Sequence, residues 1–133
     1  MGSSKAQVSC ASISAYLWSI QLLMDTLKLP SDFDYLPDMY ADSYFPTSEV
    51  DKVKAAIQKV VVFLEQGSAS TEKIQKKLDD MTLAINELQD DFADHDSELE
   101  TGARESIAET VERVLAHFNV AIDIEDALGE RDW

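Results

Sequence analysis

The chain is poor in the residues that build covalent or metal-centred sites. Its 133 residues include one cysteine, Cys10, and two histidines, His95 and His117. A single cysteine excludes an internal disulfide, and neither histidine lies near it in sequence, which argues against a zinc site. So few thiols are typical of a reducing compartment, and the sequence therefore predicts a cytoplasmic protein.

Glycine is scarce as well, and this bears on catalysis. The four glycines are isolated from one another, which excludes a glycine-rich phosphate loop. No spacing of serine, cysteine and histidine supports a nucleophilic triad. We therefore expect a protein without a cofactor that is not an enzyme, with a small enzyme as the least favoured alternative.

No stretch is both long and apolar enough to predict a membrane span. Residues 6–24 carry no formal charge, but four serines and Gln21 make them too polar for a spanning helix. The opening Met-Gly-Ser-Ser is typical of an expression-vector remnant. We expect residues 1–11 to be disordered or vector-derived and residues 12–133 to form a single helical domain.

Positive charge is nearly missing from the second half of the chain. Residues 79–133 hold 17 Asp and Glu against three Arg, a net charge of −14, whereas the first 78 residues have a net charge of −1. Such an acidic body repels nucleic acid and anionic membranes, so we expect direct binding to neither. Suitable partners are basic proteins, cations, or a protein whose basic groove normally holds DNA.

Helical periodicity, by contrast, is abundant. Apolar spacing predicts main helices over residues 12–28, from a cap at Thr47 or Ser48 to a stop at Gly67, over residues 70–95, and over residues 97–118 with Asn119 as the terminator. A short helix over residues 123–128 follows. The fold class predicted is all-α: a bundle of four main helices plus a short C-terminal helix.

The same spacing predicts which side chains are buried and how the last main helix begins. The second helix should bury Val50, Val53, Ile57, Val60, Val61 and Leu64. The third should bury Ile74, Leu78, Met81, Ile85, Leu88 and Phe92. The fourth should bury Leu99, Ala103, Ile107, Val111, Val114, Leu115 and Phe118. Ser97 with Glu100 has the spacing of a capping box, which predicts that the fourth helix starts at Ser97.

The connection over residues 29–47 is unusual in composition. It contains all three prolines and five of the eleven aromatic residues. Prolines stop a long helix, while aromatic side chains need apolar cover, so we expect a packed loop with a short helix around residues 38–43. A loop of this length in a small domain is often functional.

The acidic segment after residue 93 has some of the features of a cation site. Counted from Asp94, oxygen-bearing side chains fall at calcium-loop positions 1, 3, 5 and 7, with Glu105 at position 12. Leu99 occupies the position where that loop needs glycine. Asp91 and His95 lie one helical turn apart, but no Glu-x-x-His pairs accompany them. We expect no metal site.

Four further side chains have more than one interpretation. Arg104 either forms exposed pairs with acids one turn away or anchors a buried carboxylate network. Trp133, the last residue, is expected to dock and fix the tail. Trp18 and Leu22 make the first helix apolar on more than one side, and we take them as a candidate dimer interface.

Three motifs together resemble a known family. They are MYADSYFP at residues 39–46, ELETGARESI at residues 98–107 and the closing Arg-Asp-Trp. This combination is similar to a family of small acidic bacterial proteins described only as a domain of unknown function, over about residues 35–133. The resemblance supplies no activity, but it implies that the aromatic loop, the acidic turn and the tail form one unit. The candidate partner-binding residues are therefore Tyr40, Asp42, Tyr44, Phe45, Glu98, Glu100, Arg104, Glu105 and Trp133.

The leading hypothesis is a cytoplasmic protein–protein interaction module, present as a homodimer and binding a basic protein. One alternative is a nucleic-acid mimic, because carboxylates one helical turn apart over residues 79–112 approach the spacing of phosphates. Another is an immunity or antitoxin protein that binds a basic toxin. A metal-binding protein ranks with the small enzyme below these.

Overall fold

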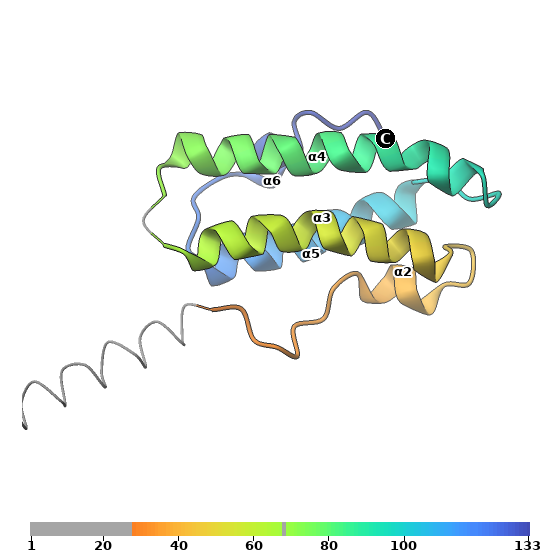
Figure 1. Ribbon diagram of the computed structural model, residues 1–133, viewed down its shortest axis with the longest axis horizontal. Coiled ribbons are helices and arrows are strands. Elements are labelled where there is room, and N and C mark those ends of the chain that lie inside the picture. Colours follow the sequence, from red (N-terminus) through yellow and green to blue (C-terminus); the bar gives the residue numbers. More distant parts are fainter. Residues whose placement is uncertain (1–27, 68) are drawn as a thin grey trace, which may run out of the picture.

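The computed structural model describes residues 28–67 and 69–133 (Figure 1). Within them are five helices and no strand: α2 (Pro37–Ala41), α3 (Thr47–Glu65), α4 (Thr71–Ala93), α5 (Thr101–His117) and α6 (Ile124–Ala127). The all-α prediction is confirmed. The helix predicted over residues 12–28, with Trp18 and Leu22, lies outside the described residues except at its last position. None of the described helices is long and apolar enough to cross a membrane.

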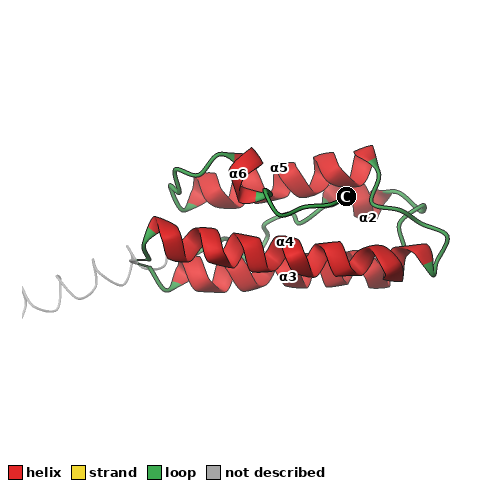
Figure 2. Cartoon of the chain, turned by 90° about the horizontal axis from the view of Figure 1, so that it is seen from above, coloured by secondary structure: helices red, strands yellow, loops and turns green. Residues whose placement is uncertain are grey.

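The helices form two layers. Figure 2 shows α3 and α4 side by side in one layer, with α5 in the other between the short helices α2 and α6. The two long helices α3 and α4 make the most extensive helix pair of the bundle. The hydrophobic core lies between the layers, which leaves the outer face of the α3–α4 layer turned toward solvent.

The buried faces follow from the apolar spacing of the sequence. All six residues predicted to be buried in α3 are buried, as are five of six in α4 and six of seven around α5. The exceptions, Leu88 and Phe118, are half-buried against the same core. Periodicity at 3.6 residues per turn therefore identified the core-facing side of each long helix correctly. The valine-rich run in α3 is helical, as its spacing predicts.

Three helix ends use a residue in the left-handed backbone region. Gly67, Asp96 and Asn119 have φ angles of 76°, 57° and 53°. After α4 the amide of Ser97 donates to the Phe92 carbonyl and that of Asp96 to the Ala93 carbonyl, the paired bonds of a Schellman motif. Gly67 and Asn119 were predicted to end their helices, and both do.

Two capping predictions are wrong. α5 begins at Thr101 with Glu100 as its N-cap, not at Ser97. The left-handed turn at Asp96 places Ser97 inside the molecule, where its side-chain oxygen is buried without a hydrogen-bond partner in the described structure. α3 has Pro46 as its N-cap and no capping side chain, so neither Thr47 nor Ser48 fills that role. Pro46 suits this position because it has no amide to satisfy.

The loop before α3 is packed, as predicted. Phe33 and Tyr35 meet edge to face at 4.9 Å, and the Arg113 guanidinium lies 4.8 Å from the Phe33 ring. The short helix starts one residue earlier than predicted, at Pro37, because Leu36 turns the chain with a φ of 50°. The buried amide of Leu36 donates to Thr110 Oγ1 at 3.1 Å, and this bond ties the start of α2 to α5.

Candidate partner-binding site

The aromatic loop and the acidic turn lie at the same end of the bundle. Figure 1 shows α2, the start of α3, the end of α4 and the start of α5 meeting on the right. Phe45 links the two parts, because its ring packs edge to face on Phe92 of α4 with 6.4 Å between centroids. We call residues 40–45 and 94–105 together the acidic end.

Two tyrosines are exposed on the acidic end. Tyr40 and Tyr44 are 36% and 39% exposed. The Tyr40 hydroxyl donates to Asp51 Oδ1 at 2.5 Å, which fixes the ring against α3. Partial burial, and then the hydrogen bond to Asp51, raise the pKa of Tyr40 well above its ordinary value. This phenol therefore stays neutral and available as a hydrogen-bonding group at physiological pH.

Asp42 and Phe45 shape the loop between these tyrosines and α3. Asp42 Oδ1 accepts from the Tyr44 amide at 2.9 Å, an Asx turn that sets the direction of the loop. Phe45 is buried and also meets Tyr44 edge to face at 5.1 Å. Phe45 thus supports the site from within, while the tyrosines form its surface.

The acidic turn carries a dense row of exposed carboxylates. Asp94, Asp96, Glu98, Glu100 and Glu105 are all exposed. Residues 90–105 hold seven acids against one arginine. Like charges so close together repel one another, and a positively charged partner would relieve that repulsion.

Arg104 takes neither of the two arrangements predicted from the sequence. It is exposed, and its guanidinium donates to Thr101 Oγ1 at 3.3 Å. Within the described part of the chain no carboxylate forms an ion pair with it. The acidic turn is therefore not neutralised by its single cation.

The C-terminal tail docks on α4, as predicted for Trp133. The Asp132 amide donates to Asn86 Oδ1 at 3.1 Å, and Asn86 Nδ2 donates to the Glu130 carbonyl at 2.8 Å. Gln89 Nε2 also donates to the Asp132 carboxylate. Trp133 packs on the core beneath the Arg131 guanidinium, which lies 5.9 Å from its ring.

A buried carboxylate behind the acidic turn was not predicted as part of the site. Glu49, in the first turn of α3, is only 4% exposed. Lys52 Nζ lies 2.9 Å from Glu49 Oε2 and 3.2 Å from Asp91 Oδ2, and these two carboxylates raise the pKa of Lys52. His95 Nδ1 donates to the Asp91 carbonyl at 3.0 Å and lies 3.9 Å from Glu49 Oε1. The position of Glu49 one residue before Val50, at the edge of the apolar face, was the only signal in the sequence.

Metal and pocket geometry do not single out the acidic end. Nowhere in residues 28–67 and 69–133 do three or more His, Cys, Asp or Glu side chains converge as a metal site would need. The best-formed hollows lie along α3, and their linings include none of Tyr40, Tyr44 and Arg104. The acidic end is an open surface, which suits a macromolecular partner better than a small substrate.

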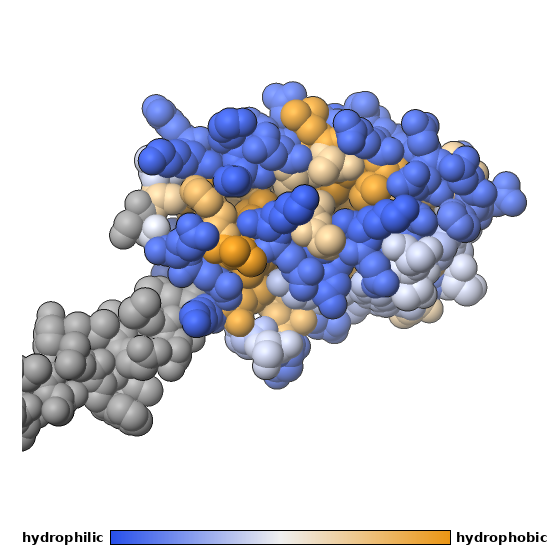
Figure 3. Space-filling view, in the orientation of Figure 1, coloured by the Kyte–Doolittle hydropathy of each residue, from blue (hydrophilic) through white to orange (hydrophobic). Residues whose placement is uncertain are grey.

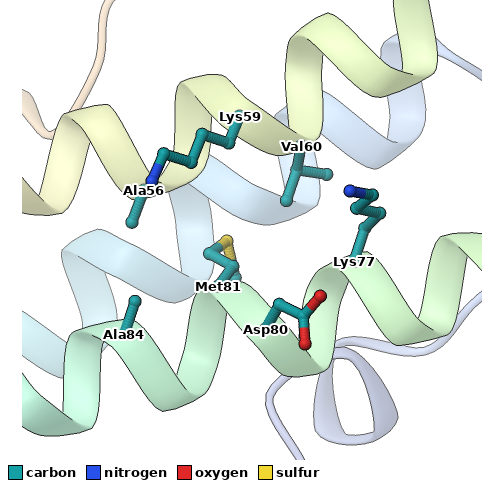
Figure 4. Close-up of a pocket in the computed structure, with 7 residues that line it drawn as sticks. All are labelled: Ala56, Lys59, Val60, Lys77, Asp80, Met81 and Ala84. Carbon is teal, nitrogen blue, oxygen red and sulfur yellow. The ribbon is translucent and has the colours of Figure 1, made fainter.

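One of these hollows lies between the outer faces of α3 and α4. Figure 4 shows Met81 and Ala84 of α4 pointing toward Ala56 and Val60 of α3. Lys59, Lys77 and Asp80 form its rim. Two neighbouring hollows share its residues and extend it in both directions along the helix pair. We call this continuous depression the α3–α4 groove.

Fold and site together define a small all-helical protein with a strongly acidic, tyrosine-bearing end. The chain belongs to the family of unknown function DUF5713, whose model matches residues 30–133. The family resemblance carried by the three sequence motifs is thereby confirmed. No curated protein and no solved structure matches the chain.

Proposed function

We propose that this protein is a non-enzymatic, cytoplasmic interaction module whose acidic end binds a basic protein. The observation that carries the proposal is the row of exposed carboxylates over residues 94–105, beside Tyr40 and Tyr44, where Arg104 forms no ion pair with any described residue. Carboxylates attract Lys and Arg of a partner, and tyrosines are enriched among the residues that dominate binding energy.

The backbone at Asp96 supports the proposal. This residue occupies the left-handed position of a Schellman motif, where glycine is the favoured residue and other side chains carry a steric cost. The equivalent turn after α3 has Gly67 there. Asp96 therefore stabilises neither the turn nor, among so many other acids, the local electrostatics.

The acidic end is also held rigidly, which lowers the entropic cost of binding. Phe45 is anchored on Phe92, Tyr40 is fixed by Asp51, and the turn itself is closed by the Ser97 and Asp96 amides. A partner would meet side chains whose backbone is already in place.

An affinity capture from the native host tests the proposal. The bait is the full chain, compared with a Glu98→Lys/Glu100→Lys variant at low and high salt. Both positions are exposed, so the fold should persist. We expect capture of a basic protein that weakens with salt and falls about tenfold or more in the variant.

The matched control is Asp32→Lys/Glu130→Lys, which makes the same change in net charge at exposed positions outside the acidic end. Capture that is equal for wild type and both variants would contradict the proposal. Equal loss in both variants would show that net charge, and not this surface, attracts the partner.

A nucleic-acid mimic is the second candidate, favoured by a separate row of acids on α5. Glu105, Glu109 and Glu112 are spaced by one helical turn and all are exposed. Side chains so spaced lie about 6 Å apart, close to the spacing of phosphates along a strand. Under this proposal the captured partner is a DNA-binding protein that duplex DNA displaces, whereas an immunity or antitoxin protein would hold a basic toxin that DNA does not displace.

We retain the homodimer as a separate proposal. Trp18 and Leu22 lie outside the described residues, and their role rests on the apolar pattern of the sequence. Light scattering of the full chain tests it: a mass equal to the monomer at all concentrations would rule the dimer out.

A further inference from the structure

The outer face of the α3–α4 layer has apolar side chains that its own bundle does not cover. Figure 3 shows orange and tan side chains between blue ones on this face. Val62 of α3 is 56% exposed, and Phe63 beside it is only half-buried, under the Lys77 ammonium at 5.4 Å. The α3–α4 groove runs across this same face.

Small residues in the groove allow a helix to pack closely against it. Ala55, Ala56 and Ala84 line its centre, so another backbone can approach closely without a clash. Val60 and Met81 form the floor at one side of these alanines. The lysines at the rim have long apolar stems that can lie along a helix while their ammonium groups stay in water.

The described chain begins next to this groove. The Leu29 amide donates to Glu65 Oε2 at 3.1 Å, so the chain enters at the C-terminal end of α3. Leu29 lines a hollow that also includes Gln58 and Val62, and those two residues line the first section of the groove. Whatever precedes residue 28 is therefore tethered at one end of an uncovered apolar surface.

The preceding sequence has the composition and length to fill it. Residues 6–24 carry no charge, and residues 12–24 place Ile13, Tyr16, Leu17, Ile20, Leu23 and Met24 at helical spacing. A helix of this segment would be about 20 Å long, and the groove from Lys77 to Asp91 spans about 21 Å of α4. Residues 25–28 remain as a connection that, when extended, spans about 13 Å.

The charges along the groove fit one direction of such a helix. Lys77 lies at the end where the chain enters, Lys59 lines the whole length, and Glu87 and Asp91 lie at the other end, where Lys52 pairs with Asp91 at 3.2 Å. A helix that leaves its C-terminus near the entry point sets its negative dipole end beside Lys77 and its positive end beside Glu87.

We propose that residues 12–24 form a helix that docks intramolecularly in the α3–α4 groove, with Met24 at the Lys77 end and Ser12 at the Asp91 end. The docked helix becomes a third layer and covers the apolar face that α3 and α4 expose. Trp18 and Leu22 fall on the opposite side of this helix from the docking stripe and stay available to a second molecule. The inference stands independently of the acidic end.

The lone cysteine provides a direct test on the full chain. A nitroxide spin label on Cys10 sits just before the docked segment, and so beside the far end of the groove. We expect it to broaden the backbone amide signals of Leu88 and Asp91 in an isotope-labelled chain, and to leave those of Glu109 and Glu112 on α5 sharp. Equal signals with oxidised and reduced label would overturn the proposal.

Matched variants show whether docking in the groove causes the broadening. Ala55→Glu/Ala84→Glu places charge on its lining at two exposed positions and should abolish the broadening. Ala116→Glu, at an exposed alanine of α5, should leave it unchanged. If the groove variant loses its dispersed amide signals, Leu17→Asp in the docking segment replaces it, and it should abolish the broadening with α3 and α4 intact. Broadening that survives in these variants contradicts docking in the groove.

A mixing experiment distinguishes docking within one chain from docking onto a second copy of the chain. Spin-labelled chain without isotope is mixed with isotope-labelled chain without spin label. Sharp Leu88 and Asp91 signals in the mixture support intramolecular docking. Broadening in the mixture would overturn it in favour of an exchange of segments between two molecules.

Discussion

The α3–α4 groove and the acidic end are both exposed, but they are exposed for opposite reasons. Residues 47–78, which form α3 and the first part of α4, hold six lysines against four acids, whereas residues 90–105 hold one arginine against seven acids. The groove has apolar side chains that need cover, and the acidic end has charges that need a counter-charge. The net charge of −15 therefore describes an uneven surface, and the two regions call for different occupants.

The largest loss of stability is expected when the packing beneath the acidic end is removed. Phe92 is fully buried and supports Phe45, so Phe92→Ala should lower the free energy of unfolding by about 3–5 kcal/mol in urea denaturation. Leu83→Ala, on the same helix at a position 47% exposed, should change it by less than about 0.5 kcal/mol. Similar values for the two variants would mean that Phe92 does not support that end.

A smaller loss is expected where α2 is tied to α5. Thr110→Val removes the acceptor of the buried Leu36 amide and leaves that amide unsatisfied, which should cost about 1–3 kcal/mol. Amide chemical shifts should move in α2, which carries Tyr40, and stay fixed along the groove. Thr71→Val, at an exposed threonine of α4, is the control. Shifts that spread equally to Ala56 and Ala84 would show that the two regions are not independent.

The turns on either side of α4 should respond with opposite signs. Gly67→Ala places a side chain at a φ of 76°, and because no atom lies within 4 Å of the added Cβ the cost of about 1 kcal/mol is backbone strain alone. Asp96→Gly relieves strain at a φ of 57° and should stabilise by about 0.5 kcal/mol while weakening capture of the basic partner. Urea denaturation measures both changes. Destabilisation by Asp96→Gly would contradict the steric cost assigned to Asp96 in this turn.

The smallest effect concerns pH at the acidic end. Because its pKa is raised above the ordinary 10.0, folded Tyr40 keeps its proton where the unfolded chain loses it. Its contribution to stability is thus complete below about pH 10 and declines as the pH rises further. Tyr40→Phe should make unfolding less steeply dependent on pH between about pH 9 and pH 11. Asp51→Asn, which removes the carboxylate that accepts the Tyr40 hydrogen bond, should weaken the same pH dependence, and an unchanged dependence in that variant would argue against the bond as a cause.

Much of the fold was predictable because helix periodicity is a local property. The apolar positions of α3, α4 and α5 identified their buried faces, and Gly67 and Asn119 marked two of the ends. The predicted helix start at Ser97 was wrong because a serine before a helical pattern does not always start the helix. In the structure the chain first turns left-handed at Asp96, and Ser97 is taken into the interior by contacts with the end of α4.

The candidate site was likewise predicted only in part. Sequence motifs brought Tyr40, Tyr44 and the acids of residues 94–105 together, and the bundle places them at one end. The buried Glu49, the unpaired Arg104 and the α3–α4 groove were not predicted, because each depends on which helices become neighbours. Alanines in two separate helices form a groove only once those helices lie side by side.

The sequence by itself determined the helical class, the core-facing side of each long helix and the uneven distribution of charge, since all three depend on the order of residues within a segment. Only the tertiary structure decided that Phe45 rests on Phe92, that the tail lies on Asn86 and Gln89, and that α3 and α4 together form a groove. These features depend on long-range packing. The free energy of burying a side chain is set by whichever element arrives opposite it, and local sequence does not specify that element.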